Sequence, residues 1–340
     1  MMAPPKLDEF DRRLIGALHL APRATWDDIG EVLAADASTL KRRFNRLHDA
    51  RMIRVIGQAD WGVHSTAMPV HLFLDVTGAT PLAVLGRLRS VPHVQLLAQI
   101  SGDYPVYAVV HAPSEAATSE AIDRLFSIRG VRRVNALPAL TTLRRGFSWD
   151  PGFLTDAERA ELLALTGDRT EGNATATGKP LSDAERTVVA LLMRDARASA
   201  ASIGRAAGLP TSTAHRLVRR VLDEKWVRPR LEAVSEWLGF RTPFLLRLRV
   251  APGETPAVMR RLDRLPQTRV SVHVASDISV LCTGLVADRA ALAAFVDAEL
   301  AGIPGIRAVS VDVYLSEPRR YWLDRDTVSG LGEFHPPAVL

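Results

Sequence analysis

A chain of 340 residues is long enough for two or more domains, each with a core of its own. Its 47% hydrophobic and 24% charged residues exclude wholesale disorder, and one cysteine, Cys282, excludes an internal disulfide and a multi-cysteine zinc site. The formal net charge of +5 and the pI of about 9.8 favour polyanionic partners.

No apolar segment reaches the roughly 18 residues of a transmembrane helix, and the N-terminus lacks the apolar part of a signal peptide. We therefore expect a cytoplasmic protein without a membrane partner. The histidines are scattered without metal-binding spacing, and no common nucleophile or dinucleotide motif occurs. These absences predict a chain that is not an enzyme and that holds no metal or cofactor.

The sequence repeats itself at an offset of 174 positions. Residues 7–54 align with 181–228 without a gap, and 13 of the 48 positions are identical. The offset returns further on, where Pro69 matches Pro243. A module of roughly 140 residues therefore occurs twice, and each copy has two parts.

The first part of each copy has the pattern of three short helices. Asp8 and Asp11 in the first copy, and Ser182 and Glu185 in the second, have the spacing of a capping box at the start of an apolar-periodic segment. The third helix begins near residue 37, and the segment after it has the pattern of a short two-stranded wing in each copy. This order predicts a winged helix-turn-helix, whose last helix enters the DNA major groove.

The outer face of the third helix is repeated more faithfully than its inner face. Leu40, Phe44 and Leu47 form the apolar face of the first copy, and different residues replace them in the second. A merely solvated face should vary freely, so the repeated serine, threonine and arginines favour double-stranded DNA as the partner. The predicted DNA contacts are Ser38, Thr39, Lys41, Arg42 and Arg46 in the first copy, and Ser212, Thr213, His215, Arg216, Arg219 and Arg220 in the second.

The second part of each copy reads as strand, helix, strand, strand, helix, strand. This is the ferredoxin-like βαββαβ order, an antiparallel sheet with two helices on one face. We expect the open faces of the two sheets to cover each other. The fold class is therefore α+β, with two copies of a winged helix-turn-helix domain followed by a ferredoxin-like domain.

The expected domain boundaries follow from the repeat. In chain order they are 1–62 and 66–145 for the two domains of the first copy, 146–180 for a linker with a short helix, 181–239 and 243–316 for the two domains of the second copy, and 317–340 for a C-terminal tail.

The segments "LDEFDRRLIGALHLAPRATWDDIG", "STLKRRFNRLHDARMIR" and "GDYPVY", with their counterparts in the second copy, resemble the leucine-responsive regulatory protein (Lrp/AsnC) family. The resemblance implies a sequence-specific DNA-binding transcription regulator whose sheet domain dimerises and binds a small effector such as an amino acid. It places that effector around Gly102, Asp103 and Tyr104, with Asp277 as the counterpart in the second copy. Two units in one chain imply an intrachain pseudo-dimer that forms a homodimer or a higher oligomer.

Some proteins of this architecture resemble sirohaem decarboxylases of haem biosynthesis, which is the alternative function. That resemblance implies a histidine and arginine cluster on the strand after the first helix of the sheet domain. Here the strand has His93 without a following arginine, and the second copy has Arg269 and His273 in another order. The comparison favours the regulator over the enzyme.

Overall fold

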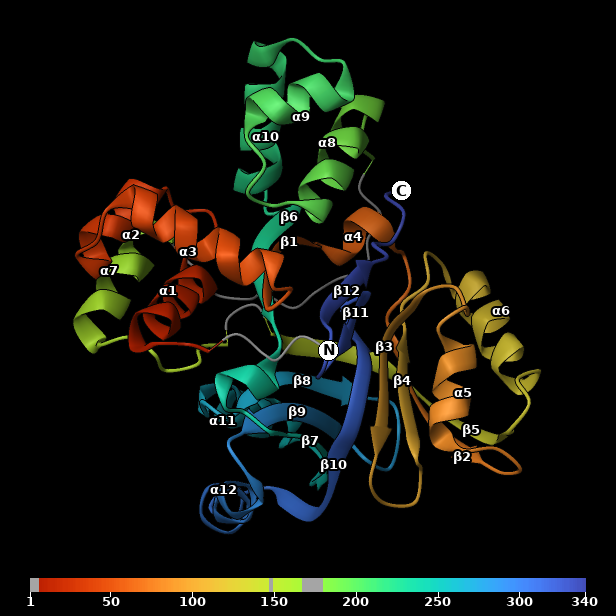
Figure 1. The fold of residues 1–340 in the computed structure, drawn as a ribbon. Coiled ribbons are helices and arrows are strands. Elements are labelled where there is room, and N and C mark those ends of the chain that lie inside the picture. The colour runs from red at the N-terminus through yellow and green to blue at the C-terminus, as the bar shows by residue number, and fades with distance from the viewer. Residues whose placement is uncertain (1–5, 147–148, 167–179) are drawn as a thin grey trace.

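The computed structural model describes residues 6–146, 149–166 and 180–340 (Figure 1). The predicted α+β content is confirmed, and helices and strands follow the same order in the two halves of the chain. Most of the expected linker, residues 167–179, lies outside the described residues.

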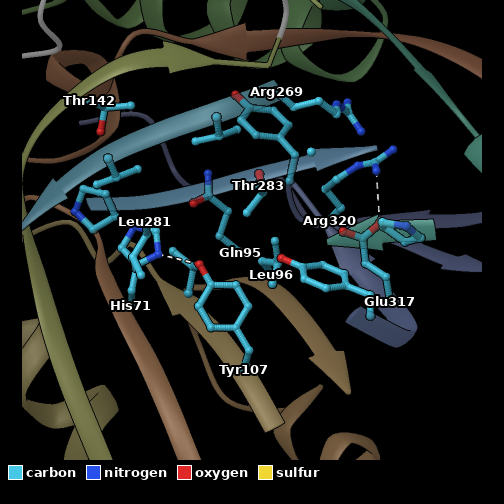
Figure 2. A pocket seen from close by; sticks show the side chains of 18 of the residues that line it. His71, Gln95, Leu96, Tyr107, Thr142, Arg269, Leu281, Thr283, Glu317 and Arg320 are labelled. Atoms are coloured by element: carbon cyan, nitrogen blue, oxygen red, sulfur yellow. Dashed lines mark hydrogen bonds and ion pairs between the residues drawn. The ribbon is translucent and has the colours of Figure 1, made fainter. Parts of the chain in front are cut away.

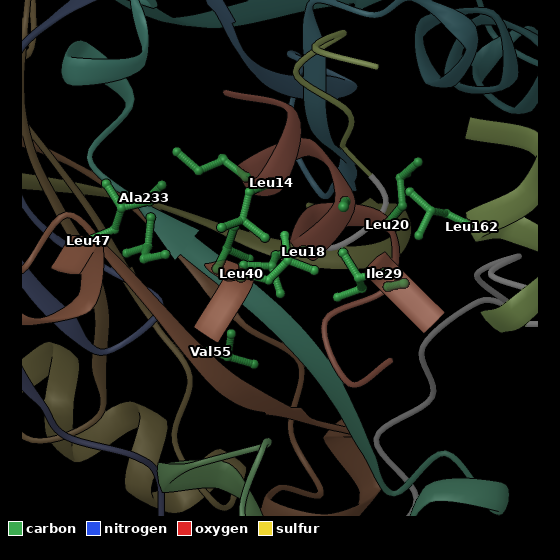
Figure 3. Packing of buried hydrophobic residues seen from close by; sticks show 14 of the residues in the cluster. Leu14, Leu18, Leu20, Ile29, Leu40, Leu47, Val55, Leu162 and Ala233 are labelled. Atoms are coloured by element: carbon green, nitrogen blue, oxygen red, sulfur yellow. The ribbon is translucent and has the colours of Figure 1, made fainter. Parts of the chain in front are cut away.

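The first half begins with α1 (Glu9–Leu20), α2 (Trp26–Leu33) and α3 (Ala37–Asp49). The Asp8 carboxylate accepts from the N–H of Asp11, and the Asp11 carboxylate accepts from the N–H of Asp8, so the predicted capping box is present. Apolar residues spaced by one helical turn meet between the three helices, and α7 (Asp156–Thr166) adds Leu162 to them (Figure 3). The core of this domain includes Leu14, Leu18, Ile29, Leu40 and Leu47.

The second half begins with α8 (Asp183–Arg194), α9 (Ala200–Ala207) and α10 (Thr211–Asp223). Ser182 and Glu185 form the capping box at the start of α8. The three helices bury a separate apolar core that includes Val188, Leu192, Ile203, Val218 and Val221. Each group of three helices is therefore a helix-turn-helix unit with its own interior.

The wing differs from the expectation of two strands in each copy. The first copy supplies one strand, β1 (Ile53–Ala59), and then forms the short helix α4 (Trp61–His64). The second supplies β6 (Val227–Ala233), followed by the 3-10 helix η1 (Ser235–Leu238). β1 and β6 pair with each other in antiparallel register. Because a lone strand leaves its backbone groups unpaired, each copy completes the ribbon of the other.

Each half continues with one sheet unit in the order strand, helix, strand, strand, helix, strand. In the first half these are β2 (Val70–Val76), α5 (Pro81–Leu88), β3 (Val94–Ile100), β4 (Val106–Val110), α6 (Glu115–Phe126) and β5 (Val131–Arg145). In the second they are β7 (Thr242–Val250), α11 (Thr255–Arg264), β8 (Thr268–Val274), β9 (Val280–Val286), α12 (Arg289–Ala294), which continues as η2 (Phe295–Leu300), and β10 (Ile306–Arg320).

The last strand of each unit joins both sheets. β5 pairs with β2 in its own unit and then with β8 of the other, while β10 pairs with β7 and then with β3. These two exchanges close the strands into one barrel, with α5 and α6 outside one side and α11 and α12 outside the other (Figure 1). The inner faces bury a shared core that includes Phe73, Tyr107, Leu137, Val272 and Leu281.

The chain beyond residue 316 continues the sheet. β10 runs on to Arg320, and β11 (Leu323–Asp326) and β12 (Gly330–Phe334) extend its edge as an antiparallel hairpin. Trp322, Leu323 and Phe334 form an apolar cluster with Ile56 of the shared ribbon. The segment expected to be a tail therefore fastens the barrel to the ribbon.

Candidate functional site

The outer faces of α3 and α10 carry the side chains predicted to contact DNA. Ser38, Lys41 and Arg42 are exposed on α3, and Ser212, His215, Arg216 and Arg219 are exposed on α10. Thr39 and Thr213 are half-buried at the edges of these faces. The two helices therefore present similar polar surfaces to solvent.

Arg46 and Arg220 have partners within their own helix-turn-helix units. Arg46 bonds to Asp11 over 2.5 Å, and Arg220 bonds to Glu185 over 2.8 Å. Asp11 and Glu185 are the third residues of α1 and α8, where they also complete the capping boxes. Each acid thus ties the start of the first helix to the last helix. These ion pairs give a structural reason, independent of DNA, for the presence of an arginine at this position in both copies. Comparison of the two copies in the sequence does not reveal that reason.

Arg42 and Arg216 differ from that pair. Neither forms an ion pair or hydrogen bond with any residue that the structure describes, although Arg216 is close enough to Glu185 to help lower the pKa of that carboxyl. Arg43, which has no arginine counterpart in the second copy, bonds to Asp8 and Asp11. Of the repeated arginines on the two helices, Arg42 and Arg216 are therefore the two without such a bond to the described residues.

A reciprocal contact joins the two helix-turn-helix units. Arg23 donates to the carbonyl oxygens of Ala196 and Ala198, and Arg197 donates to those of Pro22 and Ala24. The Arg197 guanidinium also lies 4.0 Å from the centre of the Trp26 ring. Burial, followed by the charge of Arg23, lowers the pKa of Arg197 to about 10. These contacts hold the two units against each other at the turns that precede α2 and α9.

A cavity of about 120 Å³ lies between the two sheets, at the end of the barrel nearest the β1–β6 ribbon (Figure 2). Its apolar wall comes from both sheets and includes Leu96, Val109, Val272 and Leu281. Its polar lining includes His71, Gln95, Tyr107, Thr142, Arg269 and Tyr314. An apolar pocket with a few converging polar groups is the usual form of a small-molecule site.

Three of the polar groups in this lining have no hydrogen-bond partner within the described part of the chain. They are Thr142 Oγ1 on β5, Arg269 Nε on β8 and Tyr314 Oη on β10. Thr142, Arg269 and Tyr314 are only 2%, 6% and 7% exposed. Buried polar atoms are nearly always paired, so three unpaired atoms around one cavity mark it as the candidate ligand site.

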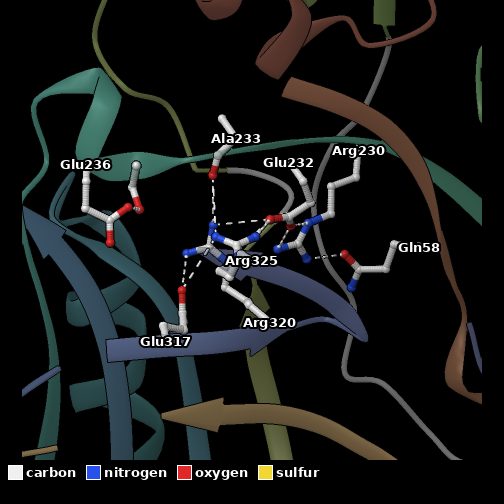
Figure 4. A network of polar contacts seen from close by, with 9 residues as sticks. Gln58, Arg230, Glu232, Ala233, Glu236, Glu317, Arg320 and Arg325 are labelled. Atoms are coloured by element: carbon white, nitrogen blue, oxygen red, sulfur yellow. Dashed lines mark hydrogen bonds and ion pairs between the residues drawn. The ribbon is translucent and has the colours of Figure 1, made fainter. Parts of the chain in front are cut away.

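The cavity is bounded on one side by a buried network of charges (Figure 4). Glu232, which is fully buried, bonds to Arg230 over 2.5 Å, to Arg325 over 2.7 Å and to Arg320 over 3.2 Å. Arg320 also bonds to Glu317 over 3.1 Å. Burial alone would raise the pKa of Glu232, but the surrounding arginines hold it well below its usual range.

Arg269 lies in the field of this network without joining its hydrogen bonds to Glu232. Burial lowers the pKa of Arg269 well below its usual range, and the positive charge of Arg320 lowers it further. Its contact with Trp149 is a ring contact, with the guanidinium 5.1 Å from the ring centre. The side chain is therefore a buried guanidinium on which the two acids, Glu232 and Glu317, do not offset burial and the like charges of Arg320 and Arg230.

His71 and Tyr107 form a neutral pair on the opposite sheet. His71 Nδ1 and the Tyr107 hydroxyl share a hydrogen bond of 2.5 Å. Burial lowers the pKa of His71 to about 4, so the imidazole is uncharged at neutral pH, and burial raises the pKa of Tyr107. The cavity thus has a cationic side and a neutral, hydrogen-bonding side.

The effector turn implied by the family resemblance is not part of this cavity. Gln95 lines the cavity at the start of β3, whereas Gly102, Asp103 and Tyr104 follow the far end of that strand. Gly102 has a φ of +85°, and a Cβ there would meet the carboxylate of Asp312. Asp277, in the corresponding turn, forms an exposed ion pair of 2.6 Å with Arg249.

The cavity lining had only a partial signal in the sequence. His71 is two residues from Phe73 on β2, and the period of a strand turns both toward the other sheet. Arg269 occupies a bulge, because Thr268 pairs with Gly284 and Val270 with Thr283. A bulge redirects a side chain, so alternation alone does not place Arg269 in the cavity. His93 and His273 do not line it.

A family model for the AsnC-type helix-turn-helix domain matches residues 7–48. This match confirms the predicted helix-turn-helix domain at the N-terminus, which places the chain among DNA-binding helix-turn-helix proteins. An uncharacterised HTH-type transcriptional regulator of Pyrococcus abyssi is 25% identical over 137 residues, which span 40% of this chain and 87% of the relative. The similarity to AsnC-type regulators is therefore shown for the N-terminal helix-turn-helix domain, residues 7–48.

Solved structures extend the comparison to the whole chain. The sirohaem decarboxylase NirDL superposes with a TM-score of 0.58 and 11% identity over 92% of this chain and 93% of that one. The same enzyme has been solved with an iron-uroporphyrin III analogue, and it matches equally well. AsnC of E. coli gives a TM-score of 0.39 and 16% identity over 44% of this chain and 99% of that one.

The expectation that the chain is not an enzyme is wrong. It assigned this architecture to regulators and relied on the absence of short catalytic motifs, whereas a structure that matches nearly the full chain is an enzyme. Within the described ranges, no helix is long and apolar enough to cross a membrane, and no group of three or more potential ligands is arranged for a metal ion.

Proposed function

We propose that the chain is a sequence-specific transcription regulator that carries two DNA-reading helices on one covalent pseudo-dimer and responds to a small effector. In this proposal the chain is a tandem duplication, divided as the repeat predicts into two helix-turn-helix and two ferredoxin-like domains. The observation that carries it is the repeated outer face of α3 and α10, on which Arg42 and Arg216 are exposed and free of ion pairs among the described residues.

We assign the predicted DNA contacts two roles according to the partners that each side chain has within the chain. An arginine without an internal partner can form a bidentate contact with guanine, so Arg42 and Arg216 are the proposed base readers. Ser38, Thr39 and Lys41, with Ser212, Thr213, His215 and Arg219, are proposed to contact phosphates. Arg46 and Arg220 would have to leave their acids before contacting DNA, and we give them the smaller part.

Gel-shift titration tests the base readers. Arg42→Ala and Arg216→Ala should each reduce discrimination at one base pair by about 1 to 3 kcal/mol. Arg46→Ala removes the same charge from the same helix, so it controls for general electrostatic attraction. It should weaken binding about equally for all sequences and lower the thermal stability of the domain.

The operator is first selected from random DNA. An unchanged sequence preference in both Arg42→Ala and Arg216→Ala would contradict the proposed readers. No DNA binding at low salt, where electrostatic attraction is strongest, would contradict the regulator itself.

A sirohaem decarboxylase is the second candidate, and the likeness in fold over 92% of the chain favours it. The reaction would break a carbon–carbon bond of a substrate carboxylate, release carbon dioxide and place a proton on the remaining carbon. The purified chain is incubated with sirohaem without oxygen, and the product is analysed by mass spectrometry. Loss of carbon dioxide from the tetrapyrrole at a rate above the protein-free control would support this candidate, and unchanged sirohaem would contradict it.

A further inference from the structure

We propose that the cavity between the sheets binds a small organic carboxylate that carries no positive charge, such as a 2-oxo acid, with its carboxylate on Arg269 and its apolar part against Leu281 and Val272. The inference rests on the proposed function only in making this ligand the effector. It differs from the amino acid implied by the family resemblance in both chemistry and location.

Positive charge is in excess at one end of the cavity. Four buried or nearly buried arginines, Arg230, Arg269, Arg320 and Arg325, lie with the acids Glu232 and Glu317 at one end of the cavity. The cations remain in excess even if Glu236, which is half-buried nearby, is counted with the acids. A buried charge without compensation is costly, and an anion in the cavity would relieve that cost.

Three polar atoms around the cavity have no hydrogen-bond partner among the described residues. Arg269 Nε, Tyr314 Oη and Thr142 Oγ1 lie on three different strands and line the same cavity. Guanidinium and hydroxyl groups can all donate, and a carboxylate has enough lone pairs to accept from several donors at once. One carboxylate group therefore matches the chemistry of all three.

The two copies of the repeat differ in the residues that line this cavity. At the offset of 174, Arg269 corresponds to Gln95, and each occupies a bulge at the start of its strand. Tyr107 corresponds to Leu281 at the same offset. The pseudo-symmetric positions thus give one sheet a cation where the other has an amide, which orients a single ligand with one charged end.

Charge and size narrow the class of ligand. The ammonium group of an amino acid would lie in the field of excess arginines, while a ketone oxygen or an aryl group would not be repelled. A cavity of about 150 Å³ holds a benzene molecule, so the 120 Å³ here suits a short-chain acid better than one that carries an aromatic ring. A tetrapyrrole is much larger than this space.

The test uses the full chain and a panel of 2-oxo acids from pyruvate to phenylpyruvate, each beside the amino acid of the same side chain. Isothermal titration and thermal unfolding are measured without DNA. At least one 2-oxo acid should bind and raise the unfolding temperature, and its amino acid should bind at least about tenfold more weakly. Failure of every 2-oxo acid to bind, or equal binding of the matched amino acid, would overturn the inference.

Arg269→Met tests the carboxylate contact, and Arg261→Met on the exposed face of α11 is its matched control. Arg269→Met should weaken binding about tenfold or more while leaving the unfolding temperature of the ligand-free protein equal or higher, because an uncompensated cation is removed. A purely structural arginine would instead lower that temperature. Unchanged affinity in Arg269→Met, or an equal loss in Arg261→Met, contradicts the proposal.

Two further binding measurements, with operator DNA and with sirohaem, distinguish a failure of the cavity assignment from a failure of the proposed function. Arg269→Met should bind the selected operator as the wild type does when no ligand is present. Carboxylate binding without any DNA binding would contradict the proposed regulator function and leave the assignment of the cavity intact. Binding of sirohaem that depends on Arg269, together with no response to the small acids, would overturn the small-ligand assignment.

Discussion

Glu232 is the residue on which the buried charge network converges. Its carboxylate accepts from Arg230, Arg320 and Arg325, and those arginines belong to β6, β10 and β11. One acid therefore links the shared ribbon to the barrel and to its C-terminal hairpin. Each guanidinium loses hydration in this position, and the carboxylate supplies the compensation.

Glu232→Gln should lower the free energy of unfolding at pH 7 by about 3 to 5 kcal/mol, because it leaves buried cations without their counter-charge. The folded-state pKa of Glu232 is depressed, so its contribution is complete above the ordinary glutamate pKa of about 4.3 and is lost as the pH falls toward the folded value. The wild type and the variant should thus converge in acid. Urea unfolding at a series of pH values measures this.

Glu161→Gln, on an exposed turn of α7, is the control for that experiment. It should leave the free energy of unfolding within about 0.5 kcal/mol of the wild type. A difference between Glu232→Gln and the wild type that stays constant into acid would show that the carboxylate charge is not the stabilising element.

The repeat in the sequence indicates which faces of the helices are apolar or polar, but not the role of each arginine. The repeat correctly separated the apolar and polar faces of α3 and α10, since helical spacing alone fixes those faces. It did not distinguish Arg42 from Arg46, because both recur. The difference lies in Asp11, a residue 35 positions away whose approach to Arg46 depends on the packing of α1 against α3.

At the scale of elements, the two helix-turn-helix units are held together by the turns that precede α2 and α9. Arg23 and Arg197 are related by the offset of 174, and each donates to two backbone carbonyls of the other unit. Hydrogen bonds from a charged donor contribute about 1.5 to 3 kcal/mol each. These hydrogen bonds therefore stabilise the relative placement of α3 and α10.

The double variant Arg23→Ala with Arg197→Ala should weaken binding to a DNA with two half-sites while affinity for a single half-site stays the same. The reason is that a looser pair of units loses effective concentration at the second site. Gel shifts with one and two half-sites at several spacings measure the effect. Tighter two-site binding by the variant would mean that these arginines hold the units apart from their DNA-binding arrangement.

The sequence predicted the individual strands better than it predicted their partners. Alternation of apolar and polar residues indicated the strand after α3, but the expected wing requires a second strand from the same copy. The partner β6 lies more than 160 residues further along the chain. Local periodicity carries no information about a pairing at that distance.

At the scale of the whole molecule, the two halves are completed by each other. β5 and β10 leave their own sheets to pair across the barrel, and β1 pairs with β6. The apolar inner faces of the sheets then lie against each other. The sequence predicted that the two sheets cover one another, because helices cover only one face of each sheet. It did not predict the exchange of the final strands, which depends on how far β5 and β10 extend beyond the sheet of their own half.

This mutual completion makes a prediction about fragments. Residues 1–166 expressed alone should aggregate or form a homodimer, because the fragment exposes an apolar sheet face and the unpaired edges of β1, β3 and β5. Co-expression with residues 180–340 should give a 1:1 complex that unfolds in one transition, since the barrel and the ribbon then close as in the intact chain. Size-exclusion chromatography with light scattering measures the assembly, and calorimetry counts the transitions. A monomeric fragment 1–166 with cooperative unfolding of its own would show that the strand exchange is dispensable, and that each half holds its sheet without the other.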